Sequence, residues 1–142
     1  MFLYVPLMSI HTPHVDLPPR RFRRLINPRS NLGFEESSHE LRDSVIASVD
    51  YAIHKIIEEL KRAGMYENSV ILVTTDNGRG PPYSNLPLKG TKETMYEGGI
   101  RGVSFLNSPL LNTSNYTYKG LIHLTDWTPT ILRLAGKIKE KP

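Results

Sequence analysis

An acidic side chain and an amide side chain stand next to each other directly after a run of strand-forming residues. The run is residues 70–75, and Asp76, Asn77 and Gly78 follow it. Carboxylate and amide oxygens are the hard ligands that Ca²⁺ and Mg²⁺ prefer, so Asp76 and Asn77 could hold a divalent cation. They would supply only part of a site, because Ca²⁺ takes about 6–8 oxygens. The alternative is structural, since Asn-Gly after a β-rich run is also the strongest short-range signal of a tight hairpin turn.

A histidine occupies the corresponding place after the first apolar run of the chain. That run covers residues 2–10, and His11 follows it. If the two runs are parallel strands, His11 and the Asp76–Asn77 pair leave the sheet at the edge where open parallel sheets bind ligands. The hairpin alternative is then weaker, because residues 80–82 (Gly-Pro-Pro) do not begin a return strand. As a single residue, His11 could also be an ordinary turn residue.

The helix that would connect these strands has the most regular pattern in the chain. Ser37 and Glu40 have capping-box spacing, and Gly64 can adopt the left-handed conformation that ends a helix. Between them, apolar residues recur at steps of three and four and form one stripe. The stripe consists of Leu41, Val45, Val49, Ile53, Ile56, Ile57 and Leu60.

The remaining pattern predicts two more strands and a last helix. Residues 70–73 are a continuous apolar run, which is typical of a strand covered on both faces in a parallel sheet. Strand, helix and strand in this order form a βαβ unit with a right-handed crossover. Residues 102–106 form a further strand, and a helix runs from about 126 to 135, with Asp126 as a candidate cap and Gly136 ending it. We therefore expect an α/β fold with a mostly parallel sheet flanked by helices.

Composition and length limit the class of protein. The 142 residues amount to one domain, and 39% hydrophobic with 23% charged residues is typical of a globular protein. No apolar run approaches the roughly 20 residues that span a bilayer, so no transmembrane segment is expected. The apolar start lacks a basic region and a cleavage site, so we expect no signal peptide in this chain. The absence of cysteine excludes disulfides, thiolate metal sites and a cysteine nucleophile.

The formal charge of +4 is concentrated in an arginine-rich stretch. Five arginines lie between Arg20 and Arg29, inside residues 12–36, which the abundance of Pro, Arg and Asn predicts to be a long surface loop. The stretch is either a solvated loop or a polyanion-binding patch. A nucleic-acid partner is not expected, because only Phe22 interrupts the arginines and stacking aromatics are nearly absent.

Four stretches of the sequence, in order, resemble type I sulfatases, and most of all the arylsulfatase B branch. They are FLYVPLMSIHTPH, SVILVTTDNG, PLKGTKETMYEGGIRG with SFLNSPLL after it, and HLTDWTPTILRLAG. The resemblance covers residues 1–136 as a partial catalytic domain and leaves 137–142 as a short basic tail or truncated linker. It implies an alkaline-phosphatase-like sulfatase domain and a Ca²⁺-dependent sulfuric ester hydrolase that acts on sulfated sugars or aryl sulfates.

The resemblance also assigns roles to individual residues. Asp76 and Asn77 match two ligands of the family's active-site Ca²⁺, and His11 matches the histidine that contacts the sulfate ester and its leaving oxygen. Lys92 matches the lysine that binds sulfate, whereas the neighbouring Lys89 is interpreted as structural. His11 and Lys92 are thus the expected catalytic and sulfate-binding residues. The roles are chemically sound, because a cation and a lysine neutralise a sulfate ester and a histidine can protonate a departing alcohol.

One part of the family's site has no counterpart in these 142 residues. The family's nucleophile is a formylglycine made from Cys or Ser in a [C/S]-x-P-x-R motif, and no residue here fits that motif. The family's paired aspartates, which supply further Ca²⁺ ligands, are also missing. We expect a fragment or incomplete gene model of an active sulfatase, inactive by itself. The alternative is a truncated, non-catalytic sulfatase-like protein that binds sulfated polyanions.

Location and partners follow from the same resemblance. It implies a lysosomal or secreted protein whose partner is a sulfate ester substrate, a class that includes sulfated glycosaminoglycans. Asn112 and Asn115 begin glycosylation sequons, which have meaning only if the chain is secreted.

Overall fold

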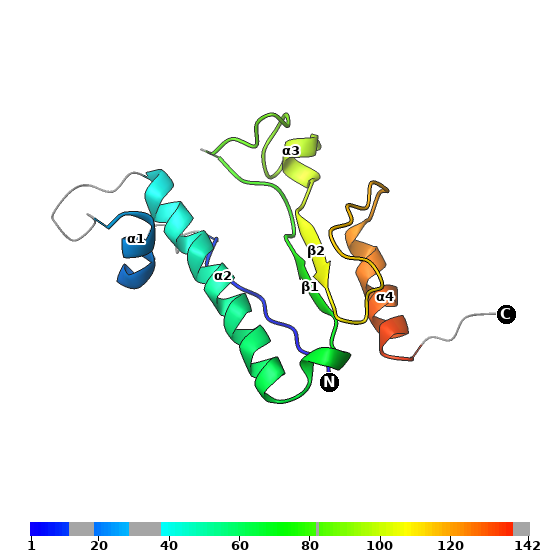
Figure 1. The fold of residues 1–142 in the computed structure, drawn as a ribbon. Coiled ribbons are helices and arrows are strands. Elements are labelled where there is room, and N and C mark those ends of the chain that lie inside the picture. Colours follow the sequence, from blue (N-terminus) through cyan, green and yellow to red (C-terminus); the bar gives the residue numbers. More distant parts are fainter. Residues whose placement is uncertain (12–18, 29–37, 82, 138–142) are drawn as a thin grey trace. The chain divides into compact units, whose positions relative to one another are not determined.

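The computed structural model describes residues 1–11, 19–28, 38–81 and 83–137 of the chain (Figure 1). These residues form two compact units, Met1–Glu67 and Asn68–Pro142, and each unit is described by itself. The predicted cap at Ser37, the last arginine of the basic stretch (Arg29) and tail residues 138–142 lie outside the described residues.

The long predicted helix is present in the N-terminal unit as α2 (Ser38–Arg62). Gly64 follows it with a φ of 67°, as predicted. The N–H of Gly64 donates to the carbonyl of Lys61, and the N–H of Met65 donates to the carbonyl of Leu60. Together these bonds form a Schellman motif, which satisfies carbonyls that the end of a helix would leave unpaired.

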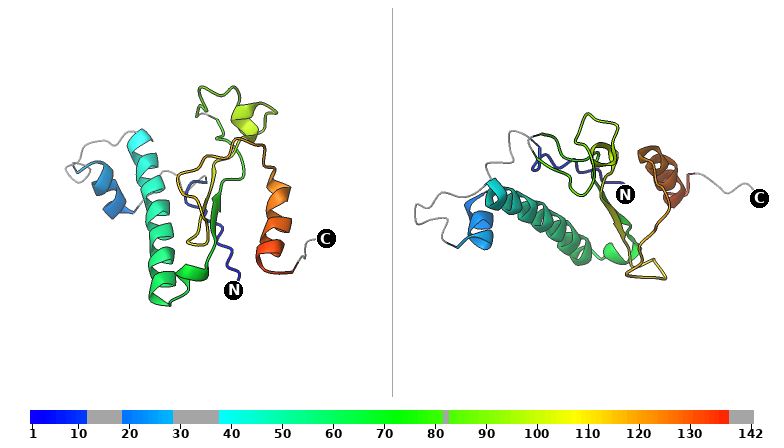
Figure 2. Two further views of the ribbon diagram at one scale, coloured as in Figure 1. Left: turned by 45° about the vertical axis from the view of Figure 1, so that its right-hand side comes forward. Right: turned by 90° about the horizontal axis from the view of Figure 1, so that it is seen from above.

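A second helix, α1 (Arg20–Ile26), lies within the stretch that we predicted to be a loop, so that prediction is wrong for these residues. Arg and Leu are good helix formers, and Pro28 stops the helix one residue after its C-cap. Both views of Figure 2 show α1 beside α2. The contact is made by Phe22, which is only 6% exposed and meets the ring of Tyr51 edge-on at 5.6 Å.

The sheet of the C-terminal unit has two strands, β1 (Ile71–Thr74) and β2 (Ser104–Asn107). They pair antiparallel, with Ile71 opposite Asn107 and Thr74 opposite Ser104. The parallel pairing predicted from the apolar run is therefore wrong for the described sheet. An apolar run shows that a strand can be buried but not the direction of its partner, and here the partner is the next strand of the chain.

The predicted first strand is also not observed. Residues 1–8 have no regular secondary structure and are all exposed. Pro6 lacks the N–H that a sheet ladder requires, which lowers the tendency of this run to form a strand.

Helices complete the C-terminal unit. A short helix, α3 (Glu97–Ile100), precedes β2. After β2 come the 3₁₀ turn η3 (Leu124–Asp126) and α4 (Trp127–Leu134), close to the predicted 126–135. Gly136 ends α4 with a φ of 68° and donates its N–H to the carbonyl of Arg133, as expected of a helix-ending glycine.

Asp126 acts as a cap, but through a capping box that begins three residues earlier. Its Oδ2 accepts the N–H of His123 at 2.7 Å, while Nδ1 of His123 accepts the N–H of Thr125. The two side chains thereby satisfy backbone donors at the start of η3.

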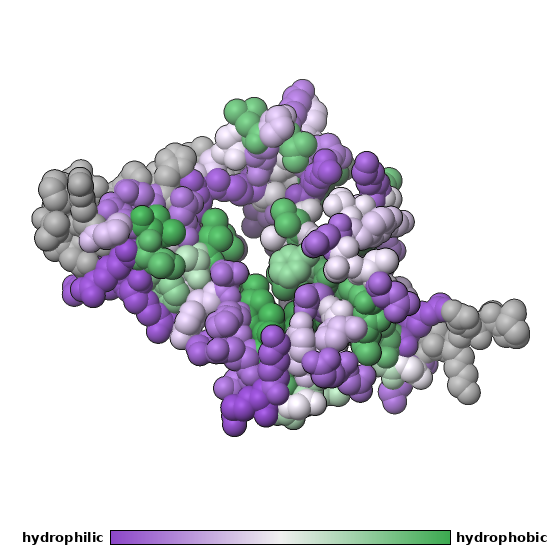
Figure 3. Space-filling view, in the orientation of Figure 1, coloured by the Kyte–Doolittle hydropathy of each residue, from purple (hydrophilic) through white to green (hydrophobic). Residues whose placement is uncertain are grey.

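Much apolar surface is exposed. Apolar side chains reach the surface in several patches of the face shown in Figure 3. Phe22 and Val45 are the buried hydrophobic residues of the described part. None of the helices in the described ranges combines the length and apolar character that crossing a membrane requires.

Candidate functional site

The connection between β1 and β2 begins and ends with two arms that are hydrogen-bonded to each other. Asp76 and Asn77 lie in the first arm, just beyond β1. Before them, the N–H of Thr75 donates to the carbonyl of Val103 at 2.9 Å, and Oγ1 of Thr75 accepts the N–H of Val103 at 2.8 Å. After them, the N–H of Gly78 donates to the carbonyl of Gly99 at 2.9 Å. The tight Asn-Gly hairpin is thus not formed. Instead, backbone bonds on both sides fix Asp76 and Asn77.

Glycines allow this close pairing. A Cβ added to Gly78 would lie 1.9 Å from the carbonyl oxygen of Gly98, and one added to Gly98 would lie 2.3 Å from that of Gly90. Both Gly98 and Gly99 are buried. These positions require glycine because backbone atoms occupy the space that a side chain would need.

Lys92 is held by its backbone on the opposite arm of the same loop. Its N–H donates to the carbonyl of Arg79 at 2.8 Å, three residues beyond Asp76. Its side chain passes Gly80, where an added Cβ would lie 3.8 Å from Cβ of Lys92. The residue is half-buried, and its ammonium group has no hydrogen bond or ion pair among the described residues. A cation without a carboxylate partner is available to an anionic ligand.

Asn85 connects the two arms and was not identified from the sequence. Its Oδ1 accepts the N–H of Arg79 at 2.9 Å, and its Nδ2 donates to the carbonyls of Arg79 at 3.0 Å and Gly90 at 3.1 Å. The carbonyl of Arg79 therefore accepts hydrogen bonds from both the side chain of Asn85 and the backbone N–H of Lys92. The available signal was the position of Asn85 among prolines, where an Asn side chain typically completes a turn by bonding the backbone.

The side chains of Asp76 and Asn77 fit a partial calcium site. Asp76 is exposed, and its carboxylate makes no hydrogen bond or ion pair in the described ranges. Nδ2 of Asn77 donates to the carbonyl of Gly78 at 2.8 Å, which leaves Oδ1 as a ligand oxygen. The described residues contain no cluster of three or more His, Cys, Asp or Glu side chains that could hold a metal. Asp76 and Asn77 would thus supply a minority of the oxygens that Ca²⁺ needs.

The surroundings of Lys89 and His11 differ from those of Lys92. The ammonium of Lys89 lies 4.1 Å from the ring centroid of Tyr96, a cation–π contact that occupies its charge. His11 is exposed and donates its N–H to the carbonyl of Met8 at 3.0 Å in a turn. His11 belongs to the N-terminal unit, whereas Asp76, Asn77 and Lys92 belong to the other one. Its convergence with them stays a prediction.

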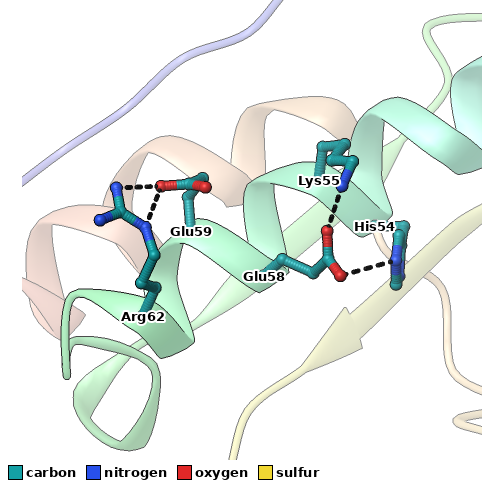
Figure 4. Close-up of polar contacts among 5 residues, drawn as sticks. All are labelled: His54, Lys55, Glu58, Glu59 and Arg62. Carbon is teal, nitrogen blue, oxygen red and sulfur yellow. Dashed lines mark hydrogen bonds and ion pairs between the residues drawn. The ribbon is translucent and has the colours of Figure 1, made fainter.

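Helix α2 carries two ion-pair groups (Figure 4). Glu58 contacts both Lys55 and His54, and Glu59 contacts Arg62. The hydrogen bond from Lys55 lowers the pKa of Glu58, and the same bond raises the pKa of Lys55. Neighbours at i,i+3 and i,i+4 of this kind stabilise an exposed helix.

The candidate glycosylation sites lie in the connection between β2 and η3. Asn112 and Asn115 are both exposed, and Asn115 has a φ of 57°.

Comparison with known proteins identifies the family. The Sulfatase family model matches residues 1–137, so the chain belongs to the sulfatase family and the predicted membership is confirmed. Arylsulfatase J of Mus musculus is 41% identical over 143 residues, covering 99% of this chain and 23% of that protein. N-acetylglucosamine-6-sulfatase of Homo sapiens is 31% identical over 107 residues, covering 75% of this chain and 19% of that protein. The chain thus spans about a fifth to a quarter of the length of these curated relatives.

The fold agrees with a solved structure. The crystal structure of Ps i-CgsB in complex with k-i-k-neocarrahexaose superposes with a TM-score of 0.77 at 24% identity. The superposition covers 92% of this chain and 28% of that one. The two therefore share a fold over this region, and the helices and small sheet described above are consistent with part of a sulfatase domain.

Proposed function

We propose that the chain is part of a Ca²⁺-dependent sulfuric ester hydrolase of the arylsulfatase type. One arrangement carries the proposal. The backbone of Lys92 is bonded to Arg79, so an unpaired ammonium lies on the same paired loop as the Asp76 carboxylate and the Asn77 amide oxygen. Membership of the sulfatase family and 41% identity to arylsulfatase J support the assignment.

Each residue has a chemical task in this proposal. Lys92 binds the sulfate oxygens, and its half-buried setting strengthens that attraction relative to bulk water. Asp76 and Asn77 hold the cation from one side. Bound Ca²⁺ would help to neutralise the charge of the sulfate ester. His11 protonates the departing alcohol, since histidine is the side chain that most often acts as a general acid.

The proposed substrates are sulfated sugars or aryl sulfates, including sulfated glycosaminoglycans. The names of two similar proteins support sugars: one relative is an N-acetylglucosamine-6-sulfatase, and the structural neighbour was solved with a neocarrahexaose. We also propose a lysosomal or secreted location. Exposure of both sequon asparagines, Asn112 and Asn115, is compatible with glycosylation there.

A chimera tests the proposal. Residues 70–102 of this chain replace the matched segment of mouse arylsulfatase J, and hydrolysis of 4-methylumbelliferyl sulfate is measured. We expect the chimera to keep at least about a tenth of the parent kcat/KM, which corresponds to an activation free energy raised by no more than roughly 1.4 kcal/mol. A folded chimera without sulfatase activity would contradict the proposal. The parent enzyme with its own segment re-inserted through the same junctions is the control.

A further inference from the structure

We propose that α1 carries a binding surface for a sulfated polysaccharide chain. The surface, called here the arginine face, consists of Arg20, Arg21 and Arg24. It deepens the proposed function and rests on it for its partner, the polymer that bears the sulfate esters. Small aryl sulfates would not need this surface.

Helix geometry separates the arginines from the packed side of α1. Residues of an α-helix are about 100° apart, so Arg20 and Arg24 share the side opposite Phe22. Phe22 is buried, and its ring contacts Tyr51 of α2. Docking through Phe22 therefore turns Arg20 and Arg24 outward, and both are exposed.

Arg21, the third residue of the arginine face, is held by contacts with two aromatic rings. The guanidinium carbon of Arg21 lies 4.7 Å from the ring centroid of Phe22 and 4.8 Å from that of Tyr51. Arg21 nevertheless remains exposed. Stacking leaves the edge of a guanidinium free to donate hydrogen bonds, so Arg21 can contact an anion while its plane is held.

The charge of this face is uncompensated. The sequence of α1, RRFRRLI, has four arginines and no acid, which equals the formal charge of the whole chain, +4. Arg20, Arg21 and Arg24 make no ion pair within the described part of the chain. On α2, Glu40 accepts a hydrogen bond from Asn27 at 2.9 Å, and Asp43 lies 3.9 Å from Arg42. Each of these carboxylates thus has a partner outside the arginine face.

The surface is formed before any ligand arrives. Phe22 and the bond between Asn27 and Glu40 hold α1 against α2 at two points. Ordering a flexible basic loop on binding would cost affinity, and a docked helix avoids much of that cost. Guanidinium groups also match oxyanions in shape, because their N–H donors form a fork.

A nucleic acid is disfavoured by the same packing. Binding of single strands relies on exposed aromatic rings that stack on bases. The ring on α1, Phe22, is 6% exposed and already in contact with Tyr51. The face therefore offers charge and hydrogen-bond donors without a stacking platform, which favours a sulfated sugar.

Heparin binding by the 142-residue chain tests this inference. Kd is measured over a series of salt concentrations for the wild type and for the double variant Arg20→Gln/Arg24→Gln. We expect the double variant to bind about tenfold more weakly and the salt slope to fall by about 2, roughly one unit for each charge removed. Unsulfated hyaluronan should bind at least about tenfold more weakly than heparin.

A matched control removes two charges elsewhere in the same unit. Lys61→Gln/Arg62→Gln, at the end of α2, should change the heparin Kd by less than about twofold. Equal weakening by the control pair, equal affinity for hyaluronan, or tighter binding of a DNA duplex would each overturn the inference. The chimera described above contains residues 70–102 and not α1, so its outcome is independent of this one.

Discussion

Single side chains of the candidate site depend on the backbone that carries them. Lys92 and Asp76 make no side-chain bonds within the described residues, yet the backbone bonds beside them fix the positions from which they project. This arrangement leaves both charges available to a ligand. It also means that substitution of the loop glycines should destabilise the loop more than substitution of the charged residues.

Substitution of Gly98 should therefore damage the loop more than substitution of Gly80. Gly98→Ala would put Cβ 2.3 Å from a backbone carbonyl, whereas the Cβ of Gly80→Ala would meet Lys92 at an ordinary 3.8 Å. We expect Gly98→Ala to lower the free energy of unfolding by about 1–3 kcal/mol and Gly80→Ala by less than about 0.5 kcal/mol. Urea unfolding of both variants measures this. Equal effects would show that the close approach at Gly98 does not exist.

Among the elements, the loop that carries the site is organised by one amide. Asn85 makes three hydrogen bonds to two backbone positions, and Arg79 is both its partner and that of Lys92. We infer that Asn85 is a positioning residue, acting through the backbone of Lys92 and not on substrate.

Removal of Asn85 should loosen Lys92 without removing its charge. We expect Asn85→Ala to increase the hydrogen-exchange rate of the Lys92 amide at least about tenfold, because part-buried backbone groups of Arg79 and Gly90 lose their partner. Ser84→Ala is the neighbouring control; its hydroxyl accepts the N–H of Leu86 at 3.2 Å, so it should leave the Lys92 amide unchanged. Unchanged exchange in Asn85→Ala would contradict the positioning role.

Helix α2 should show a pH dependence that originates in Glu58. The folded-state pKa of Glu58 is lowered by Lys55, so its contribution is present above the ordinary value of 4.5 and is lost as the pH falls through the folded value. The raised pKa of Lys55 keeps its own contribution in place below 10.5. Far-UV circular dichroism should show less helix in Glu58→Gln than in the wild type between these limits and no difference in acid. A difference that persists in acid, or one shared by the control Glu67→Gln, would contradict this origin.

Features that depend on nearby residues were predicted correctly from the sequence, whereas features that depend on contacts formed only in the folded chain were not. Gly64 and Gly136 ended their helices as predicted, because a helix end is decided by neighbours within a few residues. The direction of β1 depends on which segment pairs with it, and α1 depends on the docking of Phe22 on Tyr51. Neither contact is visible in local periodicity. The same limit applies to Asn85, whose partners lie five and six residues away in the folded loop.

At the level of the whole molecule, the chain is a sulfatase family member that spans about a fifth to a quarter of its curated relatives. Accordingly, the chain contains only part of the candidate site. In the proposed function it would supply two oxygen ligands and one lysine, and residues 1–142 contain no [C/S]-x-P-x-R segment. Family resemblance predicted roles for Asp76, Asn77, Lys92 and His11, whereas elementary patterns alone suggested only the residues that follow the expected strands, and these roles stay predictions.

The purified 142-residue chain should accordingly not turn over 4-methylumbelliferyl sulfate, with or without added Ca²⁺. Catalysis by the family requires a nucleophile that these residues do not encode, and the remaining groups would bind the ester without displacing its alcohol. Release of 4-methylumbelliferone above the buffer blank is the measurement. Turnover that scales with chain concentration and persists through a second purification step would contradict the expectation.

The central claim is that Lys92, and not Lys89, binds the sulfate ester. Within the arylsulfatase J chimera, Lys92→Ala should lower kcat/KM for 4-methylumbelliferyl sulfate on the order of 10²–10³-fold, because the unpaired cation proposed to bind the sulfate is lost. Lys89→Ala, which removes a charge held over Tyr96, should lower it less than about fivefold. Comparable losses, or a larger loss for Lys89→Ala, would contradict the account.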